Sequence, residues 1–468
     1  MPSLASIVKA YDVRGLVPDQ LDEDVARALG RAFGQVVADD PSGTAVVGHD
    51  MRDSSPGLAA AFADGLRTTG RDVVLVGLVS TDALYYASGA LDAPGAMFTA
   101  SHNPAQYNGV KLCRAGARPV GQDSGLDDVR RFAEELLDGD ASPAEVTGAL
   151  SHRDVLADYG RHLRGLVDLA AIRPLKVVVD AGNGMAGLTA PAVLGTDAGL
   201  DPLPLEVVPL YFELDGSFPN HEANPLEPAN LVDLQAAVVE HGADLGLAFD
   251  GDADRCFVVD ERGAPVSPSA VTALVAAREI AVDQARGGNP TVIHNLITSR
   301  AVPELVAELG ARSVRTRVGH SFIKAQMAEH DAIFGGEHSA HYYFRDFWFA
   351  DTGMLAAMHV LAALGEQPLP LSELAVDYER YASSGELNST VTDAAARTED
   401  VRLAFAGDVV EDHLDGLTLT CDGPDGRLSW SLNLRASNTE PLLRLNVEAA
   451  DRATMEQVRD RALALIRA

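Results

Sequence analysis

A coarse pattern of strands and helices occurs three times along this 468-residue chain and limits the folds that it can adopt. In each pass, short strand-like runs alternate with amphipathic stretches of helical period. This alternation is typical of α/β layers with largely parallel strands. The passes begin near residues 44, 176 and 291, a spacing that fits whole domains rather than the short units of a solenoid.

Each pass has the same expected order of strand, helix, strand, helix and strand. The expected strands are 44–48, 72–77 and 95–100, then 176–180, 203–211 and 243–249, then 291–296, 313–318 and 331–336. After about residue 371 the pattern changes to one that indicates a smaller α+β domain with antiparallel strands. We predict an α/β protein with three similar domains, whose sheets are mixed but mainly parallel, and a C-terminal α+β domain. The predicted bounds are 1–150, 151–258, 259–370 and 371–468.

Composition excludes several classes of protein. The length exceeds what one hydrophobic core serves, and 47% hydrophobic residues indicate a globular chain. A net charge of −31 argues against nucleic-acid and anionic-membrane partners. The sequence shows neither an apolar run of membrane-spanning length nor a signal-peptide core. Its three cysteines have no metal-binding spacing, which fits a reducing compartment, and we expect a cytoplasmic protein.

Polar segments follow the third expected strand of every pass. They are TASHNPAQYNGVKL (99–112), DGDADR (250–255) and GGEHSAH (335–341). Ligands of open α/β sheets bind at the carboxyl ends of the strands. Chance could place one polar loop after a strand, but three in equivalent places make ordinary surface loops a less attractive interpretation.

Ser101 and His102 stand side by side in the first of these segments. Adjacent side chains of an extended backbone point to opposite faces. We therefore expect that His102 does not take a proton from Ser101 as the base of a catalytic triad does. A helix cap or Asx-turn is the alternative interpretation of this segment.

DGDADR places Asp250, Asp252 and Asp254 at alternate positions of one tight turn. Three carboxylates so close repel one another unless a cation lies among them, and oxygen ligands suit Mg²⁺. An EF-hand is disfavoured because strand-like residues 256–258 occupy its later ligand positions. We predict one Mg²⁺ per chain here, with a solvated acidic turn as the alternative.

GGEHSAH supplies side chains that suit a sugar ligand. Glu337 and Ser339 can hydrogen-bond to vicinal hydroxyl groups, and His341 can act as a general acid or base. The segment lacks the HExxH pattern of zinc proteases. Ordinary loop residues are the alternative interpretation.

RASNTEPLLR (435–444) gathers arginines and hydroxyl groups in one turn of an acidic chain. Guanidinium groups, hydroxyls and loop amides together form a phosphate cradle. The residues concerned are Arg435, Ser437, Asn438, Thr439 and Arg444. An arginine-bearing hairpin turn is the alternative.

Two further arginines stand alone in the N-terminal part of the chain. Arg14 lies in YDVRG and Arg52 lies in GHDMR. Isolated arginines are mostly surface residues, and from residue pattern alone we expect no more of these two.

With these four motifs in this order, the chain resembles the α-D-phosphohexomutase family, and most of all its phosphomannomutase/phosphoglucomutase branch. The resemblance runs from YDVRG to the C-terminal domain. It implies four domains around a central cleft, the first three sharing one topology. It also implies that Ser101 is phosphorylated and joins the three aspartates in binding Mg²⁺. The implied sugar-reading residues are Glu337, His338 and Ser339, and the implied phosphate-binding residues are those of the 435–444 segment.

The resemblance places further residues in supporting positions. Arg14, Lys111 and His341 match positions that assist proton transfer or charge stabilisation, and nearby cations such as Arg14 would favour neutral Lys111. The remaining supporting residues are Arg255, His102, Asn103 and His320.

The implied reaction interconverts mannose 6-phosphate and mannose 1-phosphate. Phosphoserine gives its phosphoryl group to the sugar, a hexose 1,6-bisphosphate forms, and the other phosphoryl group returns to the serine. The bisphosphate is then both intermediate and activator, and the expected partners are small hexose phosphates, with a monomer or weak homodimer as the assembly. His338 of GEHS differs from the GEES, GEQS and GEMS variants of glucose-specific, glucosamine-specific and dual-specificity branches.

Three alternatives to a phosphomannomutase remain at this level. The first is a phosphoglucomutase or phosphoglucosamine mutase. The second is a Mg²⁺-dependent sugar-phosphate phosphatase, in which water attacks the phosphoserine. The third is a binding protein without catalysis, although such a protein has no need of a nucleophile beside three intact acidic ligands.

Overall fold

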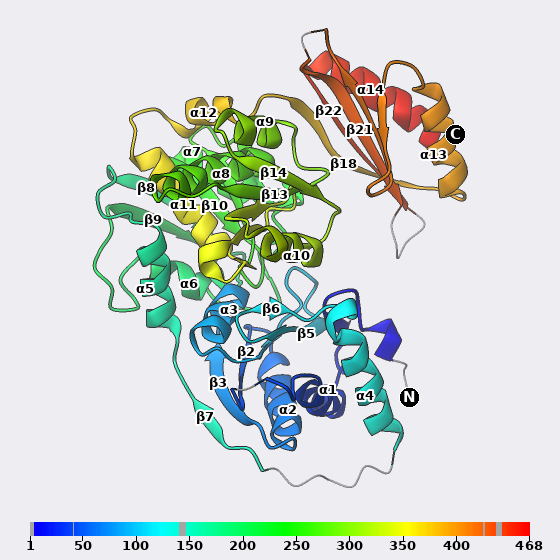
Figure 1. The fold of residues 1–468 in the computed structure, drawn as a ribbon. Coiled ribbons are helices and arrows are strands. Elements are labelled where there is room, and N and C mark those ends of the chain that lie inside the picture. The colour runs from blue at the N-terminus through cyan, green and yellow to red at the C-terminus, as the bar shows by residue number, and fades with distance from the viewer. Residues whose placement is uncertain (1–3, 41, 140–146, 425, 437–441) are drawn as a thin grey trace. The chain divides into compact units, whose positions relative to one another are not determined.

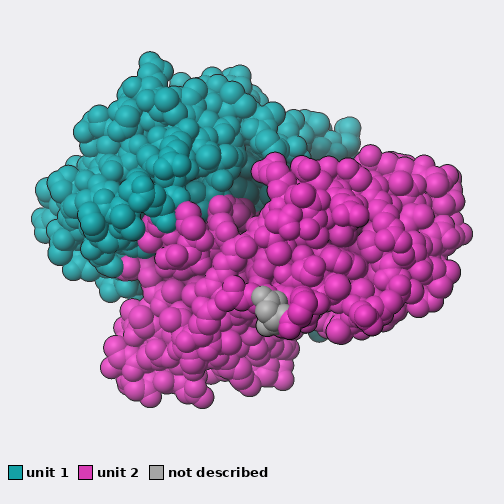
Figure 2. Space-filling view, turned by 90° about the horizontal axis from the view of Figure 1, so that it is seen from above, with its two compact units in different colours: residues 1–266, 339–373 teal, residues 267–338, 374–468 magenta. Residues whose placement is uncertain are grey.

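The computed structural model describes residues 4–40, 42–139, 147–424, 426–436 and 442–468. The chain divides into two compact units, coloured separately in Figure 2. Unit 1 comprises residues 1–266 and 339–373, and unit 2 comprises residues 267–338 and 374–468. The chain therefore leaves unit 1, returns to it and leaves it again.

The N-terminal part of unit 1 contains a mixed sheet in the order β1-β5-β4-β2-β3-β7, with β6 beside β5 (Figure 1). Strands β4, β2, β3 and β7 are parallel, whereas β5 is antiparallel to both β4 and β1. The strands are β1 (Val13–Leu16), β2 (Thr44–His49), β3 (Asp72–Leu78), β4 (Gly95–Phe98), β5 (Tyr107–Arg114), β6 (Arg118–Pro119) and β7 (Leu150–His152). The helices are α1 (Glu23–Val36), α2 (Ser55–Arg67), α3 (Thr81–Ala90) and α4 (Leu126–Asp138).

A second sheet in unit 1 has the order β12-β11-β10-β8-β9. Strand β8 is parallel to β9 and β10, and β11 is antiparallel to β10. The strands are β8 (Leu175–Asp180), β9 (Leu205–Leu210), β10 (Leu245–Phe249), β11 (Cys256–Asp260) and β12 (Pro265–Val266). The helices are α5 (Leu156–Leu166), α6 (Ala186–Val193) and α7 (Val232–His241).

Unit 2 begins with three parallel strands in the order β14-β13-β15. They are β13 (Thr291–Asn295), β14 (Arg312–Thr316) and β15 (Phe334–Gly336), accompanied by α8 (Pro268–Ala285), α9 (Ala301–Glu308) and α10 (His320–His330). The chain then re-enters unit 1 as an antiparallel pair and a buried helix. These elements are β16 (Tyr342–Phe344), β17 (Ala350–Asp351) and α11 (Gly353–Gly365), after which α12 (Leu371–Leu374) leads back to unit 2.

The C-terminal part of unit 2 is an antiparallel sheet in the order β18-β22-β21-β20-β19. Its elements are β18 (Ala382–Thr390), α13 (Ala394–Ala404), β19 (Val410–Asp412), β20 (Leu417–Asp422), β21 (Leu428–Ala436), β22 (Leu442–Ala449) and α14 (Arg452–Ile466). Apolar residues of the strands and of both helices form a separate core here. Asp451 caps α14 by accepting from the Thr454 amide.

The three α/β sheets share one strand arrangement. The first strand of each pass lies between the second and the third, as β4-β2-β3, β10-β8-β9 and β15-β13-β14 show. The predicted α/β class with an antiparallel C-terminal α+β part is therefore confirmed. The repeated pattern did not indicate the added strands β1 and β5, although β5 contains the end of the first polar segment, whereas β11 contains the residues 256–258 that were expected to be strand-like. The four domain bounds remain predictions.

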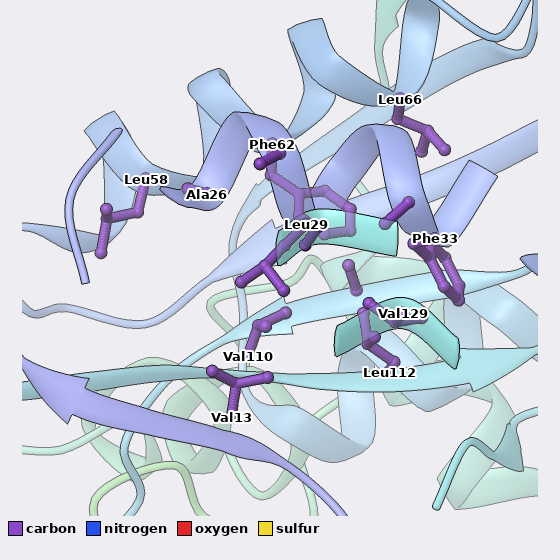
Figure 3. Packing of buried hydrophobic residues seen from close by; sticks show 14 of the residues in the cluster. Val13, Ala26, Leu29, Phe33, Leu58, Phe62, Leu66, Val110, Leu112 and Val129 are labelled. Atoms are coloured by element: carbon purple, nitrogen blue, oxygen red, sulfur yellow. The ribbon is translucent and has the colours of Figure 1, made fainter. Parts of the chain in front are cut away.

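Helices α1, α2 and α4 cover one face of the first sheet and share its hydrophobic core (Figure 3). Phe33 and Phe62 meet there with ring centroids 5.9 Å apart. Helices α1 and α2 pack closely at two glycines. A Cβ at Gly30 of α1 would lie 2.1 Å from Phe62 O, and one at Gly65 of α2 would lie 1.9 Å from Arg27 O. Among the described residues, none of the helices combines the length and the apolar character that crossing a bilayer requires.

We expect Gly65→Ala to lower the free energy of unfolding by about 1–3 kcal/mol, because its methyl group would overlap the α1 backbone. Helix propensity alone would give the opposite sign, a gain of up to about 1 kcal/mol. Gly57 in the same helix is the control, since a Cβ there would meet only the flexible Glu23 carboxylate, at 3.1 Å. Urea unfolding should show that Gly57→Ala is neutral or stabilising, and equal losses in the two variants would contradict the packing argument.

Candidate functional site

Ser101 lies just after β4 and is held by two neighbours. Its φ of 51° is in the left-handed region, which is uncommon for a residue with a side chain. Its amide donates to Thr99 Oγ1 over 2.9 Å, and its buried Oγ donates to Asp250 Oδ2 over 2.9 Å. We call residues 250–255, which follow β10 of the second sheet, the acidic segment. The fold therefore holds the hydroxyl of Ser101 against this segment.

The expectation that Ser101 and His102 point to opposite faces is wrong. Ser101 Oγ lies 3.2 Å from His102 Nδ1, because the left-handed backbone of Ser101 is not extended. The same Nδ1 accepts from Arg255 Nη2 over 2.6 Å. Burial, together with Arg255 and Arg14, lowers the pKa of His102 to about 2. A ring whose pKa is this low, and whose Nδ1 already accepts from a guanidinium, is a poor proton acceptor and differs in this from the base of a catalytic triad.

The three aspartates after β10 are buried, with exposed fractions of 0%, 0% and 1% for Asp250, Asp252 and Asp254. Arg255 donates to both carboxylate oxygens of Asp250, from its amide and from Nε. Thr81, the first residue of α3, donates through Oγ1 to Asp252, and its amide donates to the Asp252 carbonyl. The positive end of the α3 dipole therefore faces the acidic segment and stabilises its charge.

The acidic segment fits a hard divalent cation. One oxygen from each of the three aspartates can be chosen so that all lie within 4.8 Å of one another. Asp252 Oδ1 and Asp254 Oδ1 are buried and receive no hydrogen bond from the described residues. Carboxylate oxygens in this number and spacing suit Mg²⁺. The donor set is therefore compatible with the predicted ion.

Lys111 of β5 bridges two of these carboxylates. Its Nζ lies 2.6 Å from Asp252 Oδ2 and 2.6 Å from Asp254 Oδ2. Burial alone would lower the pKa of Lys111, but the two carboxylates raise it well above its ordinary value. The expectation that nearby cations favour neutral Lys111 is therefore wrong for this arrangement, because its nearest partners are anions.

Arg14 and Asn103 are joined by a hydrogen bond between their side chains, next to Ser101. Arg14 lies in β1 and donates through Nη1 to Asn103 Oδ1 and to Ala100 O, and through Nε to Asp12 over 2.8 Å. The expectation of an ordinary surface arginine is wrong here, because Arg14 supports the turn that carries Ser101.

His341 and Ser339 belong to the part of the chain that returns to unit 1. His341 forms an antiparallel bridge with Arg255, and its Nε2 lies 3.8 Å from Asp254 Oδ1. Its Nδ1 lies 3.1 Å from Ser339 Oγ. Burial lowers the pKa of His341 to about 4, although Asp254 opposes the shift.

The expectation of an ordinary surface arginine is also wrong for Arg52 of GHDMR. Its side chain is 2% exposed and contacts the segment that carries Ser101. Thr81 gave no sequence signal either. Both lie directly after a strand and beside the start of a helix, which is the position that could have drawn attention to them.

Glu337 and His338 lie in unit 2 with partners of their own. Glu337 Oε2 accepts from Asn295 Nδ2 over 2.9 Å, and His338 Nδ1 lies 3.0 Å from Ser269 Oγ. Burial lowers the pKa of His338. Two of the three predicted sugar-reading residues are thus fixed by strand β13 and helix α8.

The C-terminal sheet places Arg435 and Arg444 opposite each other on β21 and β22. Both donate to Glu386 of β18, over 3.3 Å and 3.2 Å. This pairing offers two guanidinium groups for an anion. Ser437, Asn438 and Thr439 lie outside the described residues, as does the side chain of His320, whose backbone begins α10.

Comparison with known families matches four models along the chain. All four are phosphoglucomutase/phosphomannomutase models: alpha/beta/alpha domain I at residues 5–135, domain II at 157–263, domain III at 268–381 and the C-terminal domain at 386–465. Together they span most of both units.

Individual proteins are similar over almost the whole chain. The chain is 40% identical to a phosphomannomutase of Salmonella typhimurium over 462 residues, 97% of each chain. It is 40% identical to phosphohexose mutases of Xanthomonas campestris over 454 residues, 96% of each. A crystal structure of a phosphoglucomutase/phosphomannomutase family protein from Burkholderia thailandensis has a TM-score of 0.84 at 34% identity, covering 98% of this chain and 97% of the other.

The closeness of the acidic segment to Ser101 gives a test of the site geometry. A Cβ at Gly251 would lie 2.4 Å from Ser101 O. We expect Gly251→Ala to displace the Ser101 segment, to speed hydrogen–deuterium exchange of amides 101–108 and to cost about 1–3 kcal/mol of stability.

Gly165→Ala is the matched control, because a Cβ at Gly165 would meet nothing within 4 Å. It should leave exchange of amides 101–108 unchanged. Unaltered exchange in Gly251→Ala would show that the two segments do not pack as described.

Proposed function

Because the chain belongs to the phosphoglucomutase/phosphomannomutase family, we propose that it interconverts mannose 6-phosphate and mannose 1-phosphate. In this proposal Ser101 carries the phosphoryl group that is transferred. The enzyme is an intramolecular phosphotransferase of the isomerase class. The observation that carries the proposal is the buried Ser101 Oγ, 2.9 Å from the Asp250 carboxylate and beside two further aspartates. A hydroxyl in that position suits phosphoryl transfer, whose main requirements are alignment and charge neutralisation.

The reaction consists of two transfers. In the first, the bond between Ser101 Oγ and phosphorus breaks as phosphorus bonds to a free hydroxyl of the hexose monophosphate. The hydroxyl loses its proton to the protein, and a hexose 1,6-bisphosphate forms. In the second, the other phosphoryl group of the bisphosphate passes to Ser101 Oγ, and the proton returns to the sugar oxygen that is left.

Asp250, Asp252 and Asp254, with an oxygen of phosphorylated Ser101, would hold Mg²⁺. When bound, the ion supplies charge neutralisation for the phosphoryl group in transfer. Thr81 and Arg255 keep two of the carboxylates oriented. Lys111, which joins two of the carboxylates, adds a fixed positive charge close to the reacting atoms.

Lys111 and His341 are our candidates for proton transfer: the neutral ring of His341 can accept the proton of the sugar hydroxyl, whereas Lys111, whose ammonium form the two carboxylates stabilise, can donate one. Both lie beside Asp254, one from β5 and the other from the segment that returns to unit 1. Arg14 and Asn103 hold the serine turn, and His102 together with Arg255 lines it. In unit 2, Glu337 and His338 suit the hydroxyls of the sugar, and Arg435 and Arg444 suit the phosphate that is not in transfer.

Sugar preference rests on the relatives' names and on His338. A coupled assay with mannose 1-phosphate, glucose 1-phosphate and glucosamine 1-phosphate, in the presence of Mg²⁺ and hexose 1,6-bisphosphate, should give the highest kcat/KM with the mannose compound. A higher value for glucose or glucosamine phosphate would assign the enzyme to that substrate. Release of free phosphate at the turnover rate would favour a phosphatase instead.

Ser101→Ala should abolish interconversion, because the variant has no oxygen to accept the phosphoryl group. Mass spectrometry of the wild-type protein treated with bisphosphate should find about 80 Da on the peptide that contains Ser101. The control is Ser88→Ala, which removes an equally buried serine whose Oγ donates to Ala93 O. Full activity in Ser101→Ala would refute the assignment.

Asp252→Asn should weaken Mg²⁺ binding by roughly 100-fold or more, because it removes one negative charge from the donor set. Isothermal titration of the metal-stripped protein measures the affinity and should give one site per chain. Asp260→Asn is the control, since Asp260 caps the turn at Arg262 and Ala264 and is not part of the acidic segment. Equal affinity in Asp252→Asn and wild type would exclude this site.

A further inference from the structure

Arg52 makes an unusual set of contacts with the segment that begins at Ser101. We call residues 101–107 the serine segment. Arg52 Nη2 donates to the carbonyl oxygens of Ser101 and Asn103, over 2.8 Å and 2.6 Å. Nη1 donates to the carbonyl oxygens of Pro104 and Tyr107, over 2.9 Å and 3.0 Å. One guanidinium thus donates to four main-chain carbonyl groups of the serine segment.

The environment of Arg52 leaves the side chain little freedom. It is 2% exposed, and its Nε lies 3.2 Å from the buried carboxylate of Asp50. Asp50 is fixed in turn by Ser55 Oγ, which donates to it. The five N–H groups of a guanidinium lie in one rigid plane. The four carbonyl groups that accept from Arg52 are therefore held in a fixed position relative to the end of β2 and the start of α2.

The serine segment contains a strained residue, and the hydrogen bonds from Arg52 support it. Ser101 is left-handed, with φ 51°. Its carbonyl is confined between Arg52 Nη2 and Gly251, where a Cβ would lie 2.4 Å from the oxygen. Strained backbone of this kind persists only where its surroundings determine it.

A second loop covers Arg52 from the other side. We call residues 211–222 the covering loop. Its Phe218 ring centroid lies 5.1 Å from Arg52 Cζ, and a Cβ at Gly216 would lie 2.8 Å from Arg52 Cα. Asn183, after β8, bonds to Glu213 O, and Asp180, the last residue of β8, bonds to His221 Nε2; these hydrogen bonds hold the loop. A ring face over a guanidinium attracts it and restricts its movement.

We propose that Arg52 is a positioning residue for phosphoryl transfer: it holds the serine segment in the geometry that aims Ser101 Oγ at Asp250, and Phe218 of the covering loop holds Arg52. The proposal rests on the assignment of Ser101 as the phosphoryl carrier. Arg52 acts through main-chain carbonyls and touches neither the Ser101 hydroxyl nor the aspartates in any described contact. Its loss should therefore slow transfer far more than it weakens substrate binding.

Arg52→Lys is the main test, because an ammonium keeps the charge but cannot reach four carbonyls in one plane. We expect kcat and the single-turnover rate of phosphoryl transfer from hexose 1,6-bisphosphate to Ser101 to fall roughly 100-fold. KM should change by no more than about threefold. Exchange of amides 101–107 should become faster.

Arg71→Lys is the matched control. Arg71 lies in the same part of unit 1, is 7% exposed and donates to Val37 O and Thr44 O, remote from the serine segment. A role in stability alone predicts similar effects for the two variants. We expect Arg71→Lys to lower the melting temperature and leave the transfer rate at the wild-type value.

Phe218→Leu tests the covering loop and decides the matter if Arg52→Lys fails to fold. It keeps an apolar side chain but removes the ring face, and we expect kcat to fall about fivefold with KM unchanged. Wild-type rates in Arg52→Lys would overturn the proposal. If that variant does not fold, wild-type rates in Phe218→Leu would overturn it. Equal losses of rate in Arg52→Lys and Arg71→Lys would overturn it as well. Absence of both interconversion and Ser101 phosphorylation in the wild-type protein would instead refute the proposed function.

Discussion

The burial of three carboxylates in one turn is the constraint on which the site depends. Removing charged groups from water is costly unless opposite charges and hydrogen bonds replace the solvent. Arg255 does this for Asp250, and Lys111 does it for Asp252 and Asp254. Because Lys111 comes from β5 and the aspartates follow β10, the same ion pairs also tie the first sheet of unit 1 to the second.

The repeated topology explains why these groups meet. In each α/β sheet the third strand lies beside the first, so the segment after it emerges next to the point where the strand order reverses. Ser101 follows β4 and Asp250 follows β10 in this way. Antiparallel neighbours add to the arrangement, since β5 runs back along β4 and places Lys111 opposite Met97. Repetition of one simple unit thus supplies both the serine segment and the acidic segment.

The sequence predicts the repeated strands, the helices and the polar segments because each depends on local pattern: period, turn residues and strand ends. It placed the expected strand at 44–48 where β2 runs from Thr44 to His49. It misjudged Arg14 and Arg52, whose importance comes from carbonyl groups about 50 to 90 positions away in the chain. It also misjudged the Ser101–His102 geometry, because a left-handed serine leaves no compositional trace. Partners brought together only by folding cannot be read from spacing.

The charge balance of the site links its two proposed occupants. Three aspartates face Lys111 and Arg255, a formal excess of one negative charge. A divalent cation alone would turn this excess positive, and a phosphoryl group with a charge near −2 alone would enlarge it. Both together return the sum close to its starting value. Each occupant should therefore bind better when the other is present, and linkage requires the effect to be reciprocal. In a protein with a net charge of −31, this local compensation would let an anionic substrate approach an acidic turn.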